Sequence, residues 1–264
     1  MTDEPIYERA VPRCESFVFR ERTTRFCTVV PVINEGERII SQLSRMQELA
    51  VDRLTDVVIA DGGSTDGSME AERLKALGVR ALLVKKDKGK LSAQLRMAYA
   101  FALDEGYDGI VTIDGNGKDS VESITRFVDA LDDGIDYAQA SRFIEGGEAV
   151  NTPPIRTAAI RLIHAPLLSL AARRRFTDTT QGFRAYSRRY LEHPEVQPFR
   201  ACFETYELLA YLTVRASQLG LRTCEIPTTR SYPANEPVPT KLTAHGNADL
   251  MRILFRTLVG RYNP

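Results

Sequence analysis

Apolar and polar positions alternate along residues 26–141 with two different periods. Short apolar runs of strand length lie at residues 26–33, 56–60, 79–84, 109–113 and 136–140. Between these runs, apolar residues recur at helical spacing, as they do after Asn34. Strands that alternate with helices are typical of an α/β protein. We therefore expect a single domain with a mixed, mostly parallel central sheet flanked by helices.

The pattern changes after residue 142. Residues 182–186 and 222–226 are expected to be strands, and residues 202–219 form a strongly predicted helix between them. A proline-rich stretch then precedes a last amphipathic segment. We expect three regions: an N-terminal extension over 1–24, the main domain over 25–230, and a C-terminal proline-containing segment with an amphipathic helix over 231–264.

Charge and cysteine usage exclude several classes of protein. Lysine and arginine together number 35, as do aspartate and glutamate, so no excess of positive charge favours nucleic acid, and we expect no nucleic-acid partner. The four cysteines lack the spacing of a zinc site or a disulfide framework. Residues 1–25 are polar and lack the apolar centre of a signal peptide. These features favour a cytoplasmic protein.

Two segments suit a membrane surface better than a membrane span. No run reaches the roughly 18 uninterrupted apolar residues that a spanning helix needs. Residues 155–176 and 250–262 combine apolar positions with arginines, and basic amphipathic helices of this kind bind anionic lipid surfaces. The alternative is two core-facing helices with solvated arginines. The first reading places the protein peripherally at the inner face of the membrane.

Polar clusters follow four successive predicted strands. They are Asn34-Glu35, Asp61, the lysines of residues 85–90, and residues 114–119. In open α/β sheets the ligand lies outside the carboxyl ends of the strands, where strand order reverses. Each cluster also has a structural alternative, because such residues cap helices, form turns or make solvated charge runs. Their shared position predicts one site at this edge.

The order of several motifs resembles the family-2 glycosyltransferases of the GT-A fold, closest to the branch of dolichyl-phosphate mannose synthase and other polyprenyl-phosphate glycosyltransferases. The resemblance covers about residues 25–245. It rests on P-x-x-N-E at 31–35, D-G-G-S-T-D-G at 61–67, a D-x-D-like element at 114–119, S-R-F at 141–143, D-T-T-Q-G-F-R-A-Y at 178–186, E-I-P at 225–227 and T-K-L at 240–242. No single motif is decisive, but the ordered set is specific.

The resemblance implies a role for each matching residue. Contacts with the nucleotide sugar are implied for Pro31, Asn34, Glu35, Asp61, Ser64, Lys90, Asp114, Gly115 and Asn116. Catalytic roles are implied for Asp114, Arg184 and Lys241. Contacts with the acceptor or its phosphate are implied for Arg142, Gln181, Arg184 and Lys241.

A divalent cation, Mg²⁺ or Mn²⁺, is implied at Asp114 and Asn116. Relatives have two carboxylates in D-x-D, whereas this chain replaces the second with the neutral Asn116. Magnesium commonly keeps waters while bridging one or two carboxylates and substrate phosphates, so Asp114 with help from Asn116 or Asp119 still suffices. We expect weaker metal binding than in those relatives.

The resemblance implies inverting transfer of a hexose from a nucleotide-diphosphate sugar to polyprenyl phosphate. A lipid phosphate is already anionic, whereas a sugar hydroxyl needs a general base. The E-D pair that supplies this base in sugar-acceptor enzymes is missing, and Glu204 and Glu207 are the nearest candidates. Two alternatives stay open: transfer to a glycan hydroxyl, and a non-catalytic nucleotide-sugar-binding protein. The sequence also leaves open a homodimer and a membrane partner subunit.

Overall fold

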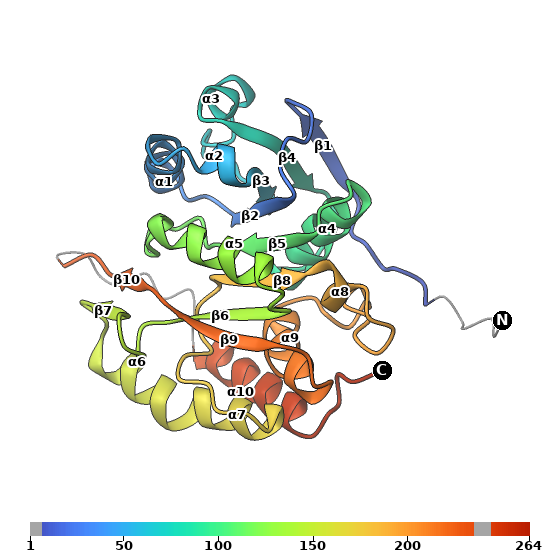
Figure 1. Ribbon diagram of the computed structural model, residues 1–264, viewed down its shortest axis with the longest axis vertical. Helices are drawn as coiled ribbons and strands as arrows, with labels where there is room; N and C mark the ends of the chain where they lie inside the picture. The colour runs from blue at the N-terminus through green and yellow to red at the C-terminus, as the bar shows by residue number, and fades with distance from the viewer. Residues whose placement is uncertain (1–6, 235–243) are drawn as a thin grey trace.

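The computed structural model describes residues 7–234 and 244–264, and for residues 244–247 it describes the backbone alone. Within them, eight strands form one sheet in the order β1-β4-β3-β2-β5-β8-β6-β9 (Figure 1). Their bounds are β1 Cys14–Val18, β2 Phe26–Val32, β3 Asp56–Asp61, β4 Val79–Lys85, β5 Gly109–Thr112, β6 Tyr137–Ser141, β8 Arg184–Ser187 and β9 Thr223–Pro227. A smaller parallel sheet pairs β7, Glu148–Val150, with β10, Thr229–Ser231.

The centre of the sheet is parallel and its margins are mixed. Strands β4, β3, β2 and β5 run parallel, as do β6 and β9. Strand β8 lies antiparallel between β5 and β6. Chain order reverses between β2 and β5, which pair directly. The expected α/β sheet is therefore confirmed, and its switch point lies at the ends of these two strands.

Helices cover both faces because β2 alternates its side chains between two cores. Cys27 and Val29 pack into one core, and Val30 and Val32 into the other. The first core includes residues of α4 Leu91–Asp104, α7 Ala165–Ala172, α9 Glu207–Gln218 and α10 Ala244–Leu258. The second includes residues of α1 Glu37–Glu48, α2 Val51–Leu54, α3 Ala71–Ala76 and α5 Ile124–Asp132.

The N-terminal region contributes to the sheet. We expected residues 1–24 to be an extension, but β1 pairs antiparallel with β4 and forms one edge of the sheet. At the other end of the chain, α10 packs against α7 and α9 (Figure 1). Parts of both flanking regions are therefore integrated into the single domain.

One helix among the described residues is long and apolar enough to cross a membrane, although the sequence predicted none. It spans Pro154–Ala172, has a mean hydropathy of 1.2 and is 28% buried. It comprises α6, Pro154–Ala159, a π-helical turn, Ile160–His164, and α7. Its two arginines interrupt the apolar run but leave its average hydropathy high. Its packing against α9 and α10 makes it part of the fold.

Asp56, at the start of β3, joins the loop before β2 to the core. Its buried carboxylate accepts hydrogen bonds from the backbone and hydroxyl of Thr23, 3.0 Å each, and from the Tyr107 hydroxyl at 2.8 Å. Arg20 forms an ion pair with it at 2.5 Å. Burial by itself would raise the pKa of Asp56, but the hydrogen bonds and Arg20 outweigh burial and lower it.

We expect Asp56→Asn to lower the free energy of unfolding at pH 7 by about 2–4 kcal/mol. The new amide N–H₂ group would point at the N–H and O–H donors of Thr23 and Tyr107, and Arg20 would lose its counterion. The folded pKa lies below the unfolded value of about 3.9, so the charge contribution is present above that pH and lost below it. Urea denaturation should therefore show the difference between the variant and the parent shrinking below about pH 4. Asp108→Asn removes the same charge from an exposed residue and should cost under about 0.5 kcal/mol; an equal loss in both variants would contradict this account.

Candidate functional site

The loop after β5 packs directly on the end of β2. The backbone N–H of Gly115 donates to the carbonyl of Pro31 at 3.3 Å. A Cβ at Gly115 would lie 2.8 Å from Cγ2 of Val32 and 3.1 Å from that carbonyl, so only glycine permits this approach. The switch point therefore brings the P-x-x-N-E and D-x-D-like motifs together, as the sequence predicted from their positions at strand ends.

Asn34 and Asp61 lie in two loops that hydrogen bonds join. The backbone N–H of Asn34 donates to Ser64 Oγ at 3.0 Å, and Asn34 Oδ1 accepts from the backbone of Thr65 at 2.8 Å. Asp61 is 2% exposed and accepts from the backbone N–H and the hydroxyl of Ser64 at 3.0 and 2.6 Å. Helix α1 has no side-chain N-cap, so Asn34 does not act as a capping residue.

Glu35 continues this polar edge toward α1. Its carboxylate is 9% exposed and pairs with Arg38 Nη2 at 2.9 Å. Glu37, two residues later, points away and pairs on the surface with Arg73. Glu35, the last residue of the P-x-x-N-E motif, is therefore buried beside α1, whereas the exposed Glu37 lies at the rim of the cleft described below.

Asp114 and Asp119 share one buried guanidinium, that of Arg230. Arg230 lies 3.3 Å from Asp114 Oδ2 and 2.5 Å from Asp119 Oδ2. On its other side Asp114 packs on Gly182, where a Cβ would lie 2.0 Å from Asp114 Oδ1. The D-T-T-Q-G-F-R loop thus touches the D-x-D-like element at a position that only glycine can occupy.

Arg230 was not predicted as a site residue from the sequence. It lies in β10 and forms a β-bridge with Asp119 across more than a hundred residues of chain. Neither hydrophobic periodicity nor a motif marks it. Its position shortly after the E-I-P motif was the one available hint, because β10 follows β9 closely.

The loop after β5 offers oxygen atoms that fit a divalent cation. Asp114 is partly exposed, and Asp119 Oδ1 is buried without a hydrogen-bond partner among the described residues. Asn116 Oδ1 already accepts a hydrogen bond from the backbone N–H of Lys118 at 3.2 Å, so it would be only a weak additional ligand for the cation. The residues described contain no cluster of three or more His, Cys, Asp or Glu side chains with metal-site geometry. This donor set suits a cation held mainly by substrate phosphates and water.

Arg142 and Gln181 meet at Asp178 in the interior. Arg142 Nε donates to Asp178 at 2.7 Å and Nη2 donates to Thr180 at 2.9 Å, while its Nη1 has no partner among the described atoms. Gln181 donates to Asp178 at 2.9 Å. The charge and hydrogen bonds of Arg142 outweigh burial and keep the pKa of Asp178 low. Both side chains are buried, and Arg142 Nη1 is a buried donor without a hydrogen-bond partner among the described atoms.

Arg184 lies differently from the phosphate contact that the sequence implied. Its guanidinium is 2% exposed and donates to the carbonyls of Gln181, Leu209 and Thr179 at 2.9, 2.6 and 3.1 Å. These carbonyls belong to the loop before β8 and to α9, and both surround the side chain. This geometry does not support a direct phosphate contact by Arg184. It supports a role in holding the loop that contains Gly182.

His164 braces the same loop from the π-helical turn. Its Nδ1 lies 2.7 Å from Thr179 Oγ1. Burial, with a smaller contribution from the Arg184 charge, lowers the pKa of His164 to about 4. The imidazole is therefore neutral at physiological pH.

The remaining residues implied by the sequence lie at the margin of the site or outside the described residues. Lys90 is exposed and its backbone N–H donates to the carbonyl of Glu204 at 2.8 Å at the start of α4. Glu207 accepts from the backbone N–H groups of Glu204 and Thr205 at 3.0 and 2.6 Å, at the start of α9. Lys241 lies outside the described residues.

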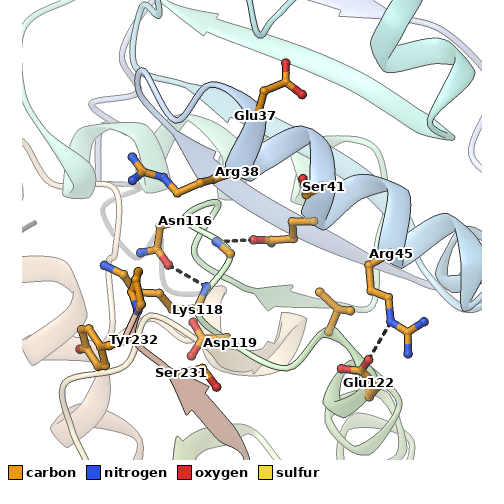
Figure 2. A pocket seen from close by; sticks show the side chains of 14 residues that line it. Glu37, Arg38, Ser41, Arg45, Asn116, Lys118, Asp119, Glu122, Ser231 and Tyr232 are labelled. Atoms are coloured by element: carbon orange, nitrogen blue, oxygen red, sulfur yellow. Dashed lines mark hydrogen bonds and ion pairs between the residues drawn. The ribbon is translucent and has the colours of Figure 1, made fainter. Parts of the chain in front are cut away.

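A cleft of about 610 Å³ lies between α1, residues 116–119 and residues 231–233 (Figure 2). Arg38, Asn116 and Lys118 line it. Asp61 and Asp114 do not line this cleft. Asp114 pairs with Arg230, and Arg230 also pairs with Asp119, which lines the cleft.

Three cations surround the ring of Tyr232 at this cleft. Lys118 Nζ and the guanidinium carbons of Arg156 and Arg230 lie 5.2, 5.4 and 5.9 Å from the ring centroid. Arg156 also donates to the Tyr232 hydroxyl at 2.7 Å. Burial and the neighbouring arginines lower the pKa of Lys118, and the same cations outweigh burial to lower the pKa of Tyr232. The cleft therefore has a positive wall suited to an anion.

The fold is similar to that of glucosyl-3-phosphoglycerate synthase from Mycobacterium tuberculosis, which was crystallised with Mn²⁺, uridine diphosphate and glucosyl-3-phosphoglycerate. The TM-score is 0.64 at 21% sequence identity, over 89% of this chain and 79% of that chain. This similarity, together with the sheet order, confirms the expected GT-A fold.

Two proteins of assigned activity are similar over most of this sequence. The chain is 28% identical over 210 residues to undecaprenyl-phosphate mannosyltransferase of Micrococcus luteus, covering 78% of this chain and 83% of that protein. It is 28% identical over 216 residues to polyprenol monophosphomannose synthase of Mycolicibacterium smegmatis, covering 78% and 77%. The model of the family described as "Glycosyl transferase family 2" matches residues 27–193. This chain belongs to that family and is a glycosyltransferase.

Proposed function

We propose that this glycosyltransferase transfers a hexose from a nucleotide-diphosphate sugar to a polyprenyl phosphate, with inversion at the anomeric carbon. The observation that carries the proposal is the group of cations around Tyr232. Tyr232 and Lys118 line the cleft beside the D-x-D-like loop, and Arg156, which contacts Tyr232, lies on the exposed apolar helix. The proteins of Micrococcus luteus and Mycolicibacterium smegmatis are named for transfer to lipid phosphates.

The donor nucleoside is proposed to bind at the linked loops after β2 and β3. Asn34 is exposed there, and Glu35 and Asp61 supply carboxylates close to the same edge. Pro31, Gly115 and Ser64 shape this surface through their backbone and hydroxyl contacts, and Lys90 lies at its margin. The diphosphate would then extend toward Asp114 and Asn116.

A divalent cation is proposed to bind at Asp114, with Asn116 and Asp119 as further oxygen donors. When bound, it stabilises negative charge on the diphosphate as a Lewis acid. The donor set accepts Mg²⁺ or Mn²⁺, because both favour oxygen ligands. The structurally similar glucosyl-3-phosphoglycerate synthase was crystallised with Mn²⁺ and uridine diphosphate, which supports the use of a divalent cation.

The acceptor phosphate is proposed to bind between Arg142 and Arg156. Arg142 has a buried Nη1 without a hydrogen-bond partner among the described atoms, and guanidinium groups bind phosphate well. Gln181 and Arg184 are proposed to position the loop that carries Gly182. Lys241 stays a prediction for phosphate binding.

In the proposed reaction, an oxygen of the lipid phosphate attacks the anomeric carbon from the side opposite the diphosphate. The bond from the anomeric carbon to the diphosphate oxygen breaks, and its electron pair leaves with the nucleoside diphosphate. The phosphate monoester is already ionised at neutral pH, so no side chain needs to remove a proton. The cationic side chains of the protein stabilise the negative charge of the phosphates, and binding orients the acceptor for attack.

The protein is proposed to bind peripherally to an anionic membrane surface. Large apolar side chains are exposed on two neighbouring helical segments, among them Ile155 at 82% and Leu162 at 76% on one and Phe255 at 63% on α10. Arg161 and Arg256 lie on the same segments. Apolar and basic side chains together match the acyl boundary and the headgroups of anionic lipid.

The transfer itself is tested with purified protein, short-chain polyprenyl phosphate and labelled nucleotide sugars of each base, supplied with Mg²⁺ or Mn²⁺. We expect label in the organic phase for one donor. Asp114→Asn should lower kcat by about 100-fold or more, because it weakens the binding of the cation and, with it, the stabilisation of the leaving diphosphate. Asp132→Asn removes a surface charge and should leave the rate unchanged. Absence of lipid-linked label with every donor would refute the proposal.

Glu207→Gln distinguishes a lipid phosphate acceptor from a sugar hydroxyl. Because Glu207 accepts hydrogen bonds from two backbone N–H groups just before α9, we expect a small loss in Tm and lipid transfer within about threefold of the parent. A general base would instead cost about 100-fold or more. Glu204→Gln tests the second candidate base in the same way and should also leave lipid transfer within about threefold of the parent. Asp132→Asn is the surface control. Abolished transfer in either glutamine variant, with the fold intact, would favour the hydroxyl acceptor.

Membrane binding is tested by co-sedimentation with vesicles of phosphatidylglycerol and phosphatidylcholine. We expect Leu162→Glu combined with Phe255→Glu to weaken binding at least about tenfold, because two apolar contacts are lost and two like charges are added. Val18→Glu places the same change on the exposed strand β1 and should have little effect. Equal binding by the parent and the double variant would exclude this surface.

A further inference from the structure

We propose that Lys118 binds the diphosphate of the sugar nucleotide and makes its binding partly independent of a divalent cation. This inference rests on the proposed donor. Lys118 lies within the D-x-D-like element at 114–119, but the resemblance implied no role for it. The inference follows from the position of Lys118, from the pairing of the nearby carboxylates and from the identity of residue 116.

The turn after Asp114 fixes Lys118 at the cleft. Asn116 Oδ1 accepts the backbone N–H of Lys118 at 3.2 Å, and Gly117 adopts a left-handed φ of 68°. The N–H of Gly117 donates to Gln42 Oε1 of α1 at 2.9 Å. The turn is thus held on both sides, and Lys118 lines the same cleft as Asn116 (Figure 2).

The charge of Lys118 is not neutralised by the carboxylates of its own loop. Asp114 and Asp119 both pair with Arg230. Among the described side chains, Lys118 forms no ion pair, and its Nζ lies 5.2 Å from the Tyr232 ring centroid. The Glu35 carboxylate, which pairs with Arg38, acts to raise the pKa of Lys118, but burial and the neighbouring arginines outweigh it. A partly buried ammonium beside two guanidinium groups favours a bound anion at this wall.

Residues 116 and 118 together change the local charge by as much as a divalent ion would. Compared with a loop that has two carboxylates and a neutral residue at 118, Asn116 removes one negative charge and Lys118 adds one positive charge. The combined change equals the charge of Mg²⁺ or Mn²⁺. The loop therefore has one carboxylate fewer for a metal ion and one cation more than such a loop would have.

In the transfer step, Lys118 acts on the leaving group. As the bond between the anomeric carbon and the diphosphate oxygen breaks, the electron pair moves onto that diphosphate. The ammonium donates hydrogen bonds to its phosphate oxygens and stabilises the added charge. No proton needs to be transferred, and the acceptor phosphate forms the new bond to the anomeric carbon.

The test measures binding of inorganic pyrophosphate by isothermal titration calorimetry in the presence of EDTA, so that neither base nor metal contributes. We expect the parent to bind and Lys118→Met to bind at least about tenfold more weakly, since hydrogen bonds to charged groups are the strong ones. Lys118→Arg keeps the charge and should retain most of the affinity. Lys75→Met removes an exposed lysine of α3 and should match the parent. Equal affinity of the parent and Lys118→Met, with both folded by circular dichroism, would overturn the inference.

Inorganic phosphate separates the donor from the acceptor as the ligand of Lys118. A diphosphate contact predicts a larger loss for pyrophosphate than for phosphate in Lys118→Met. An equal loss for both would assign Lys118 to the acceptor phosphate and overturn the inference. These binding results do not depend on catalytic transfer, so failure of the proposed acceptor would leave them interpretable.

A reciprocal variant restores the second carboxylate. Asn116→Asp combined with Lys118→Met should bind pyrophosphate poorly in EDTA and regain affinity with Mn²⁺, by a factor at least about tenfold greater than the parent gains. The same Mn²⁺ enhancement in the parent and the double variant would contradict the exchange of a metal charge for a protein charge.

Discussion

The arrangement of the site depends on one buried guanidinium shared by two carboxylates. Burial alone would lower the pKa of Arg230, but Asp119 and Asp114 outweigh it and raise the pKa, so Arg230 is charged. Removing one member of a buried ion pair typically costs about 3–5 kcal/mol, because the other charge is left without a partner. Arg230 lies in β10, whereas both carboxylates follow β5. The C-terminal part of the chain therefore sets the geometry of a loop near its middle.

The central fold could be predicted because its strands are buried on both faces. Such strands read as continuous apolar runs, and β2, β3 and β5 show them clearly. Strand β1 lacks this signal, since all its residues are exposed at the edge of the sheet. Its place is fixed by backbone pairing with β4, which leaves little trace in hydrophobicity. The sequence could therefore predict the centre of the sheet better than its margin.

The candidate site was predictable in its location but not in the direction of every side chain. The positions of Asn34, Asp61 and Asp114 follow from the rule that loops at the carboxyl ends of parallel strands share an edge. Arg184 belongs to a matching motif, yet motif letters do not show that its donors meet backbone carbonyls. Arg230 belongs to no motif, and its partner Asp119 is distant in the sequence. Arg184 is held by its own loop and by α9, and Arg230 by a distant loop, and a single sequence records neither arrangement directly.

The cleft and the exposed apolar surface are linked through two consecutive residues of one helix. Ile155 is 82% exposed, and the next residue, Arg156, lies beside Tyr232 at the cleft. Successive helical side chains are about 100° apart, so these neighbours face different surroundings while staying within one turn. A lipid whose chain covers Ile155 would have its phosphate near Arg156 without crossing the protein. The same helix can therefore recognise the charge and the apolar chain of one acceptor, whereas a soluble sugar would use only the charged side. This coupling is the structural reason to prefer a lipid phosphate over a free glycan as the partner of the cleft.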